Sequence, residues 1–108
     1  MTDQAPAAIP SCSLSPTGLE RQGARYARLA PDVFAARRSD LALEVTFAEG
    51  YDRDTLAELV AVERECCPFF ELRVDDGERR LHVGVDDAAN APALEAVATA
   101  LGVGSRTS

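Results

Sequence analysis

Apolar and polar side chains alternate along several short segments of this chain. The clearest alternation predicts β-strands at three places: residues 41–49, 69–75 and 80–86. A period of two is expected of a strand with one buried face. A short strand is also predicted at 33–38, and Asp76-Gly77 marks a hairpin between the last two strands. The pattern therefore indicates a sheet with a single covered face.

Other segments repeat apolar residues every three or four positions, as amphipathic helices do. The predicted helices cover residues 15–29, 53–66 and 90–101. Ser15, Asp52 and Asn90 are suitable N-cap residues for these three helices. Pro68 ends the second helix, because the residue before a proline is disfavoured in the helical region. Gly102 is a candidate C-cap for the third helix.

The order of these elements is helix, strand, strand, helix, strand, strand, helix. This order predicts an α+β fold: a mostly antiparallel four-stranded sheet with helices packed on one face. A ferredoxin-like arrangement is compatible with it. Residues 14–103 should form a single domain, between a disordered arm at 1–13 and a disordered polar tail at 104–108. In the first helix we expect Leu19 to face the core and Arg25 to face solvent.

Charge and composition narrow the classes of function. The chain of 108 residues has 11 basic and 18 acidic residues, a net charge of −7, and all of its basic residues are arginine. Such an acidic chain is not expected to bind nucleic acid or anionic lipid. No apolar run approaches the ~20 residues of a membrane span. Residues 1–10 lack the features of a secretory signal, so we expect a cytosolic protein with reduced cysteines.

One motif carries recognisable chemistry, the segment from Glu63 to Phe70. On a helix, Glu63 lies three residues before Cys66 and four before Cys67, so the three side chains share one face. A carboxylate and two sulfurs should therefore meet at the end of the second helix. Pro68 then turns the chain into a strand that begins with aromatic residues, which would shield the sulfurs from water.

This arrangement is compatible with binding of a soft or borderline ion, namely Hg(II), As(III), Cu(I) or Zn(II). Glu63, Cys66 and Cys67 are the predicted ligands, with Cys12 and His82 as secondary candidates. A vicinal disulfide in a thiol redox sensor is an alternative. Thiolate catalysis is disfavoured, because a helix C-terminus and nearby carboxylates raise a thiol pKa. We therefore do not predict an enzyme.

A purely structural interpretation is also open. Free cysteines often fill cores, and the protein would then be an interaction module that dimerises through the open face or edge of its sheet. Glu63 is the difficulty for this interpretation, because a buried carboxylate needs a partner. Arg25 or Arg28 from the first helix is the expected salt-bridge partner.

The run Glu63-x-x-Cys66-Cys67-Pro68-Phe69 resembles a motif, E-x-x-C-C-P-F, of small bacterial proteins without an assigned function. Many of these proteins are encoded beside metal-resistance regulators of the mercury or arsenic type. The similarity extends from the Cys12–Leu14 segment to the final helix. It implies a link to heavy-metal resistance or thiol chemistry, carried by Glu63, Cys66 and Cys67. Asp86-Asp87-Ala88 departs from the Gly-Pro that often follows the last strand in the family.

Overall fold

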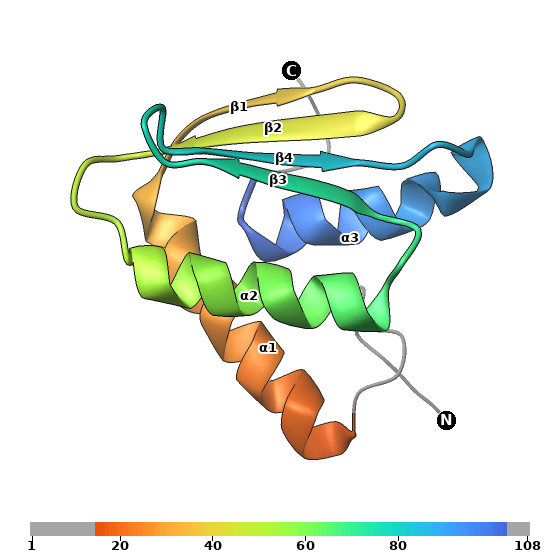
Figure 1. Cartoon of the computed structure of the whole chain (residues 1–108), viewed down its shortest axis with the longest axis horizontal. Coiled ribbons are helices and arrows are strands. Elements are labelled where there is room, and N and C mark those ends of the chain that lie inside the picture. The colour runs from red at the N-terminus through yellow and green to blue at the C-terminus, as the bar shows by residue number, and fades with distance from the viewer. Residues whose placement is uncertain (1–14, 104–108) are drawn as a thin grey trace.

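The computed structural model describes residues 15–103 and has the α+β fold predicted from the sequence (Figure 1). The helices are α1 (Pro16–Leu29), α2 (Arg53–Cys66) and α3 (Ala91–Ala100), with short 3-10 turns η1 (Ala30–Asp32) and η2 (Ala88–Asn90). The strands are β1 (Val33–Arg38), β2 (Ala42–Phe47), β3 (Glu71–Asp75) and β4 (Arg80–Gly84). The helices lie on one side of the sheet, so the predicted element order and layering are confirmed.

The sheet has the strand order β1-β2-β4-β3, and every neighbouring pair is antiparallel. Strands β2 and β3 are therefore parallel to each other, with β4 between them and α2 as their crossover, which is a split βαβ unit. A ferredoxin-like fold has the element order βαββαβ. If its two ends were joined and the chain began instead at its second strand, it would have the same element order from β1 onward and the same neighbouring strands. The fold is thus a circular permutation of that arrangement, with α1 added in front.

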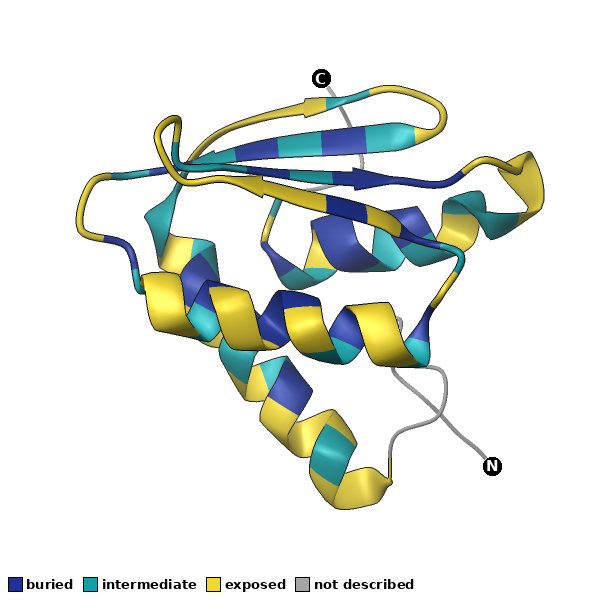
Figure 2. Ribbon diagram, viewed as in Figure 1, coloured by how far each residue is buried: buried dark blue, intermediate teal, exposed yellow. Residues whose placement is uncertain are grey.

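The core lies between the helices and one face of the sheet. The sheet contributes every second residue of the two central strands, β2 and β4, to this core. Buried and less buried positions therefore alternate along β2 (Figure 2). The largest fully buried apolar side chains are Tyr26, Leu29, Leu43, Phe47, Leu56, Leu59, Leu81, Leu94 and Leu101. The amphipathic pattern read from the sequence identifies most of these residues, because burial of one face is what produces the pattern.

Leu19, which was expected in the core, is instead exposed, and so is Leu41, the first residue of the strand predicted at 41–49. Leu19 is 36% exposed and Leu41 is 38% exposed. Leu19 lies in the first turn of α1, which is the part of this helix farthest from the sheet in Figure 1, so less of the protein covers it. Leu41 precedes the first residue of β2 and belongs to the turn between β1 and β2. The polar residue Gln22 is fully buried on the α1 face where only apolar contacts were expected.

The hairpin between β3 and β4 forms where it was predicted, but with a different turn. Strand β3 ends at Asp75 and β4 begins at Arg80, so residues 76–79 connect them. The left-handed residue is Arg79, with φ 54°, rather than a residue of the Asp76-Gly77 pair. The Asp75 carboxylate accepts a hydrogen bond from the Glu78 amide at 3.2 Å, which stabilises the longer loop.

The caps of the last helix are only partly as predicted. Asn90 makes no side-chain capping hydrogen bond. The preceding turn η2 is capped instead by Asp87, whose carboxylate accepts a hydrogen bond from the Ala89 amide at 2.9 Å. At the other end, Gly102 has a φ of 75°, as expected of a glycine that ends a helix.

Candidate functional site

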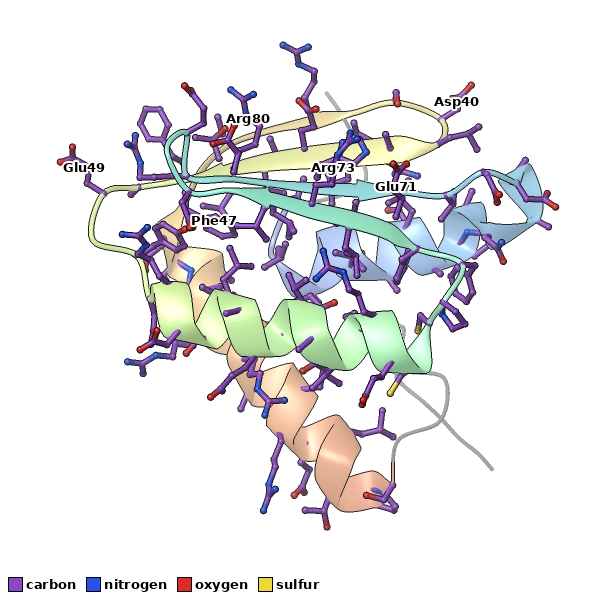
Figure 3. All side chains as sticks on the ribbon, in the orientation of Figure 1. Asp40, Phe47, Glu49, Glu71, Arg73 and Arg80 are labelled. Atoms are coloured by element: carbon purple, nitrogen blue, oxygen red, sulfur yellow. The ribbon has the colours of Figure 1, made fainter. Side chains whose placement is uncertain are left out.

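The motif from Glu63 to Phe70 lies at the carboxyl end of α2, where Figure 3 shows the sulfur atoms of the described residues. Helix α2 ends at Cys66, and Cys67 leaves the helical region with φ −130° and ψ 74°. Pro68 explains this ending, because a proline disfavours helical geometry in the residue before it. Cys66 is half-buried, whereas Cys67 is completely buried. The two thiols therefore differ sharply in their access to solvent.

Glu63 is buried, with a relative exposure of 1%, and its contacts come from α1. The Tyr26 hydroxyl donates a hydrogen bond to Glu63 Oε2 at 2.8 Å, and Gln22 Nε2 donates to the same oxygen at 3.0 Å. The other carboxylate oxygen, Oε1, is buried without a hydrogen-bond partner among the described residues. We call Gln22, Tyr26 and Glu63 the Glu63 cluster.

The expected salt bridge from Glu63 to Arg25 or Arg28 is not present. Arg25 donates to Gln22 Oε1 at 2.8 Å and pairs with Glu58 at 3.4 Å. Arg28 pairs with Asp52 at the amino end of α2. The side-chain amide of Gln22 therefore lies between the Arg25 guanidinium and the Glu63 carboxylate. The way α1 crosses α2 places Gln22, rather than an arginine, opposite Glu63.

The electrostatics of the cluster link Tyr26 to both Glu63 and Cys67. Burial raises the pKa of the Tyr26 hydroxyl well above its ordinary value, and the negative charge and hydrogen bond of Glu63 raise it further. A negative charge on Cys67 acts in the same direction, so this sulfur lies near the cluster. Tyr26 consequently stays protonated and can donate to Glu63 throughout the usual pH range.

Within residues 15–103, no group of three or more His, Cys, Asp or Glu side chains is positioned to hold a metal ion. Glu63, Cys66 and Cys67 are close in sequence, but the bonded oxygen of Glu63 faces α1. Cys12, a secondary candidate ligand, lies outside the described residues.

His82, the other secondary candidate, is not brought to the cysteines. It lies on β4 between the inward-facing Leu81 and Val83, so its ring is on the open face of the sheet. Its Nδ1 is 3.4 Å from Glu44 Oε2 on β2. A shallow hollow surrounds it, lined by Glu44, Arg73, Val74, Asp75, Asp76 and Arg80. Figure 3 shows Arg73 and Arg80 on this face, on the side of the sheet away from the helices.

Sequence reasoning missed Gln22 as a partner of Glu63. The sequence spacing does indicate that Gln22 is buried. It lies four residues before Tyr26 and seven before Leu29, which places all three side chains on the same face of the helix. A polar residue on an apolar stripe, opposite a second helix with a carboxylate on its own stripe, predicts a buried polar pair. Tyr26, whose hydroxyl also donates to Glu63, is buried on this same face of α1.

No helix in the part of the chain that the structure describes is both long and apolar enough to cross a membrane. The chain matches no protein-family model, no curated protein and no solved structure.

Proposed function

We propose that this protein is a cytosolic accessory protein that binds a soft metal or metalloid ion through Cys66 and Cys67, with Glu63 as the neighbouring carboxylate. The observation that carries the proposal is a pair of adjacent thiols beside a buried carboxylate, one oxygen of which has no hydrogen-bond partner in the part of the chain that the structure describes. Hg(II), As(III), Cu(I) and Zn(II) are the candidate ions, because thiolates prefer soft or borderline ions.

The surroundings of the thiols support this role. The half-buried Cys66 offers a first point of contact to an ion in solution, and the fully buried Cys67 offers a second, drier ligand. Phe69 and Phe70 follow the pair closely in sequence; the centroids of their two rings are 4.9 Å apart, and Phe70 is buried. An apolar wall of this kind limits access of competing ligands to a metal–sulfur bond.

Glu63 fits the proposal as a group that responds to the ion. A buried carboxylate oxygen without a partner is unfavourable by about 1–3 kcal/mol or more. A proton taken from a thiol when the ion binds, or the ion itself, would satisfy that oxygen. Because Glu63 Oε2 is held by Gln22 and Tyr26, the second oxygen has a fixed position.

The test is native mass spectrometry of the reduced protein after addition of each candidate ion. We expect an adduct of one ion per chain that is lost in the Cys66→Ser/Cys67→Ser variant. Glu63→Gln should weaken binding, whereas the matched change Glu65→Gln, at an exposed position of the same helix turn, should not. An adduct of unchanged stoichiometry and affinity in the double serine variant would refute the proposal.

A second candidate function is an interaction module in which Cys67 is core packing and the protein forms a homodimer. The complete burial of Cys67 favours this interpretation, and so does Phe34, which is 74% exposed on the edge strand β1. The other edge strand, β3, carries the charged residues Glu71, Arg73 and Asp75. Such charges protect an edge against pairing.

Sedimentation analysis of the reduced, metal-free protein tests this alternative. A dimer through β1 should dissociate in Phe34→Ser and persist in the control Val74→Ser, which changes a residue 38% exposed on the opposite edge strand. A protein that remains monomeric at millimolar concentration would exclude the dimeric module.

A further inference from the structure

His82 has a carboxylate on each side of its ring, on the open face of the sheet. Its Nδ1 is 3.4 Å from Glu44 Oε2 on β2. Its Nε2 lies over Gly84 instead, 3.1 Å from the point that a Cβ atom of residue 84 would occupy. Glu71 Oε1, on β3, lies 3.6 Å from the same point. The imidazole nitrogen and the carboxylate oxygen therefore border one space, which we call the Gly84 gap.

The register of the strands explains why these side chains meet. Glu44 and His82 are direct partners in the pair of β2 and β4, and Glu71 is the direct partner of Gly84 in the pair of β3 and β4. Residues 82 and 84 share one face of β4, because side chains alternate along a strand. Since residue 84 is glycine, it places no side chain between the His82 ring and the Glu71 carboxylate.

The Glu71 oxygen that borders the gap is not the one that pairs with arginine. Arg73 is 3.4 Å from the other oxygen, Oε2. Figure 3 shows Glu71 and Arg73 on the side of the sheet away from the helices. The Glu71 side chain is 65% exposed and free to rotate, whereas that of His82 is only 18% exposed. The gap is thus bordered by a nitrogen in a fixed position and an oxygen that can adjust to an occupant.

A neutral imidazole can donate a hydrogen bond to only one of two carboxylates, because it carries one N–H. When Nδ1 of His82 donates to Glu44, the lone pair of Nε2 faces the gap and the Glu71 oxygen. Two acceptors then share the gap with no hydrogen between them, so a positive ion would hold them together. Histidines that bind metals almost always donate their other ring N–H to a group such as a carboxylate, which is the relation of His82 to Glu44.

We propose that His82 Nε2 and Glu71 Oε1 bind a borderline divalent ion of the Zn(II) class in the Gly84 gap. Glu44 is the positioning residue that orients the imidazole. Nitrogen and carboxylate ligands suit ions of this class, and the net charge of −7 on the chain attracts cations. Two side-chain ligands leave the remaining coordination positions to water. The site lies across the sheet from the cysteine pair and does not depend on the proposed function.

The His82 ring is a specific reporter of this site, because the sequence contains one histidine. The test adds Zn(II) to the reduced full chain and follows both ring nitrogens by NMR. We expect Nε2 to become metal-bound while Nδ1 stays protonated, whichever ion occupies the cysteine pair. Glu44→Gln should weaken this binding about 10–100-fold, as loss of an orienting carboxylate typically does. Glu71→Gln, which removes a ligand, should weaken it at least as much.

Glu78→Gln is the matched control, because it removes an exposed carboxylate from the neighbouring connection between β3 and β4. Wild-type affinity in this variant, with weaker binding in Glu44→Gln and Glu71→Gln, supports the site. Equal affinities in Glu71→Gln and Glu78→Gln would overturn it, because Glu71 would then not be a ligand. A ring that takes up a second proton in acid but never has a metal-bound nitrogen would also overturn it, since a proton alone would then fill the gap.

Discussion

At the scale of single residues, the Glu63 carboxylate is the least expected feature of the core. It is 1% exposed, and within residues 15–103 only one of its oxygens has a hydrogen-bond partner. Burying a carboxylate without partners costs several kcal/mol, and the hydrogen bonds from Tyr26 and Gln22 offset part of that cost. Purely apolar residues at these positions would pack without the penalty. Hydrophobic packing alone therefore does not account for the buried polar cluster.

The hydrogen bond from Tyr26 to Glu63 should be measurable in the free energy of unfolding. Tyr26→Phe removes a donor from a buried carboxylate, so we expect a loss of about 1–3 kcal/mol in urea unfolding at neutral pH. Tyr51→Phe is the matched control, because the Tyr51 hydroxyl is buried without a hydrogen-bond partner among the described residues. Its removal should be neutral or stabilising. Equal losses in the two variants would show that the Tyr26 hydrogen bond contributes nothing of its own.

At the scale of the secondary-structure elements, the amino end of α2 predicts a pH dependence. The pKa of Asp52 is lowered from 3.8 to about 2, first by the hydrogen bond from the Thr55 amide and then by Arg28. Because the folded state favours the charged form of Asp52, this carboxylate stabilises the folded protein, and its full contribution to stability is present above about pH 4. It is lost as the pH falls toward 2. Wild-type stability should therefore decline more steeply in this range than that of Asp52→Asn.

Thermal unfolding between pH 2 and pH 7 measures this difference. Asparagine remains a good N-cap, so the two proteins should differ mainly in the pH-dependent part of their stability. Asp54→Asn, at an exposed acid one position into the helix, should preserve the wild-type slope. Parallel stability curves for the wild type and Asp52→Asn would contradict the role assigned to the Asp52 charge.

Elements with strong local signals were predictable from the sequence. Asp52 and Pro68 define α2 because an N-cap and a proline act within a few residues, and the structure ends this helix at Cys66 as predicted. The alternation along β2 likewise predicts its buried face. The left-handed Arg79 was not predictable, because the Asp76-Gly77 pair is the stronger local turn signal.

The candidate site was predictable only in part. Glu63, Cys66 and Cys67 share a helix face by spacing alone, and the burial of Glu63 follows from that face. Its partners depend on how α1 crosses α2, which is a tertiary property. A shift of one helix turn would bring Arg25 rather than Gln22 to the carboxylate, and the sequence does not distinguish these registers. The separation of His82 from the cysteines follows from the strand alternation, which places it on the open face.

At the scale of the whole molecule, the two faces of the sheet carry different chemistry. The thiols and the Glu63 cluster lie on the helical side, whereas His82 and the charged side chains of β2, β3 and β4 lie on the open side. Because the sheet separates them, changes at the cysteines should not alter an interface on the open face. The two cysteines themselves lie at the junction between α2 and β3.

That junction predicts how the two cysteines react in the folded protein. The carbonyl of Cys67 accepts a hydrogen bond from the Phe70 amide at 3.0 Å. Arg64 joins the last turn of α2 to β3 by donating to the Leu72 carbonyl at 2.7 Å. Iodoacetamide should therefore modify the half-buried Cys66 first, whereas Cys67 should react only when the junction opens locally.

Arg64→Ala should make that opening easier and accelerate modification of Cys67 about tenfold or more, since a hydrogen bond from a charged group contributes about 1.5–3 kcal/mol. The rate at Cys66 should change little, which peptide mapping by mass spectrometry can resolve. Arg53→Ala, at the opposite end of α2, is the control. If Cys67 reacts at the same rate in all three proteins and only as fast as the whole chain unfolds, its exposure requires global unfolding. An ion would then have no route to the second sulfur in the native state, so this one rate decides whether the folded protein can bind an ion through both cysteines.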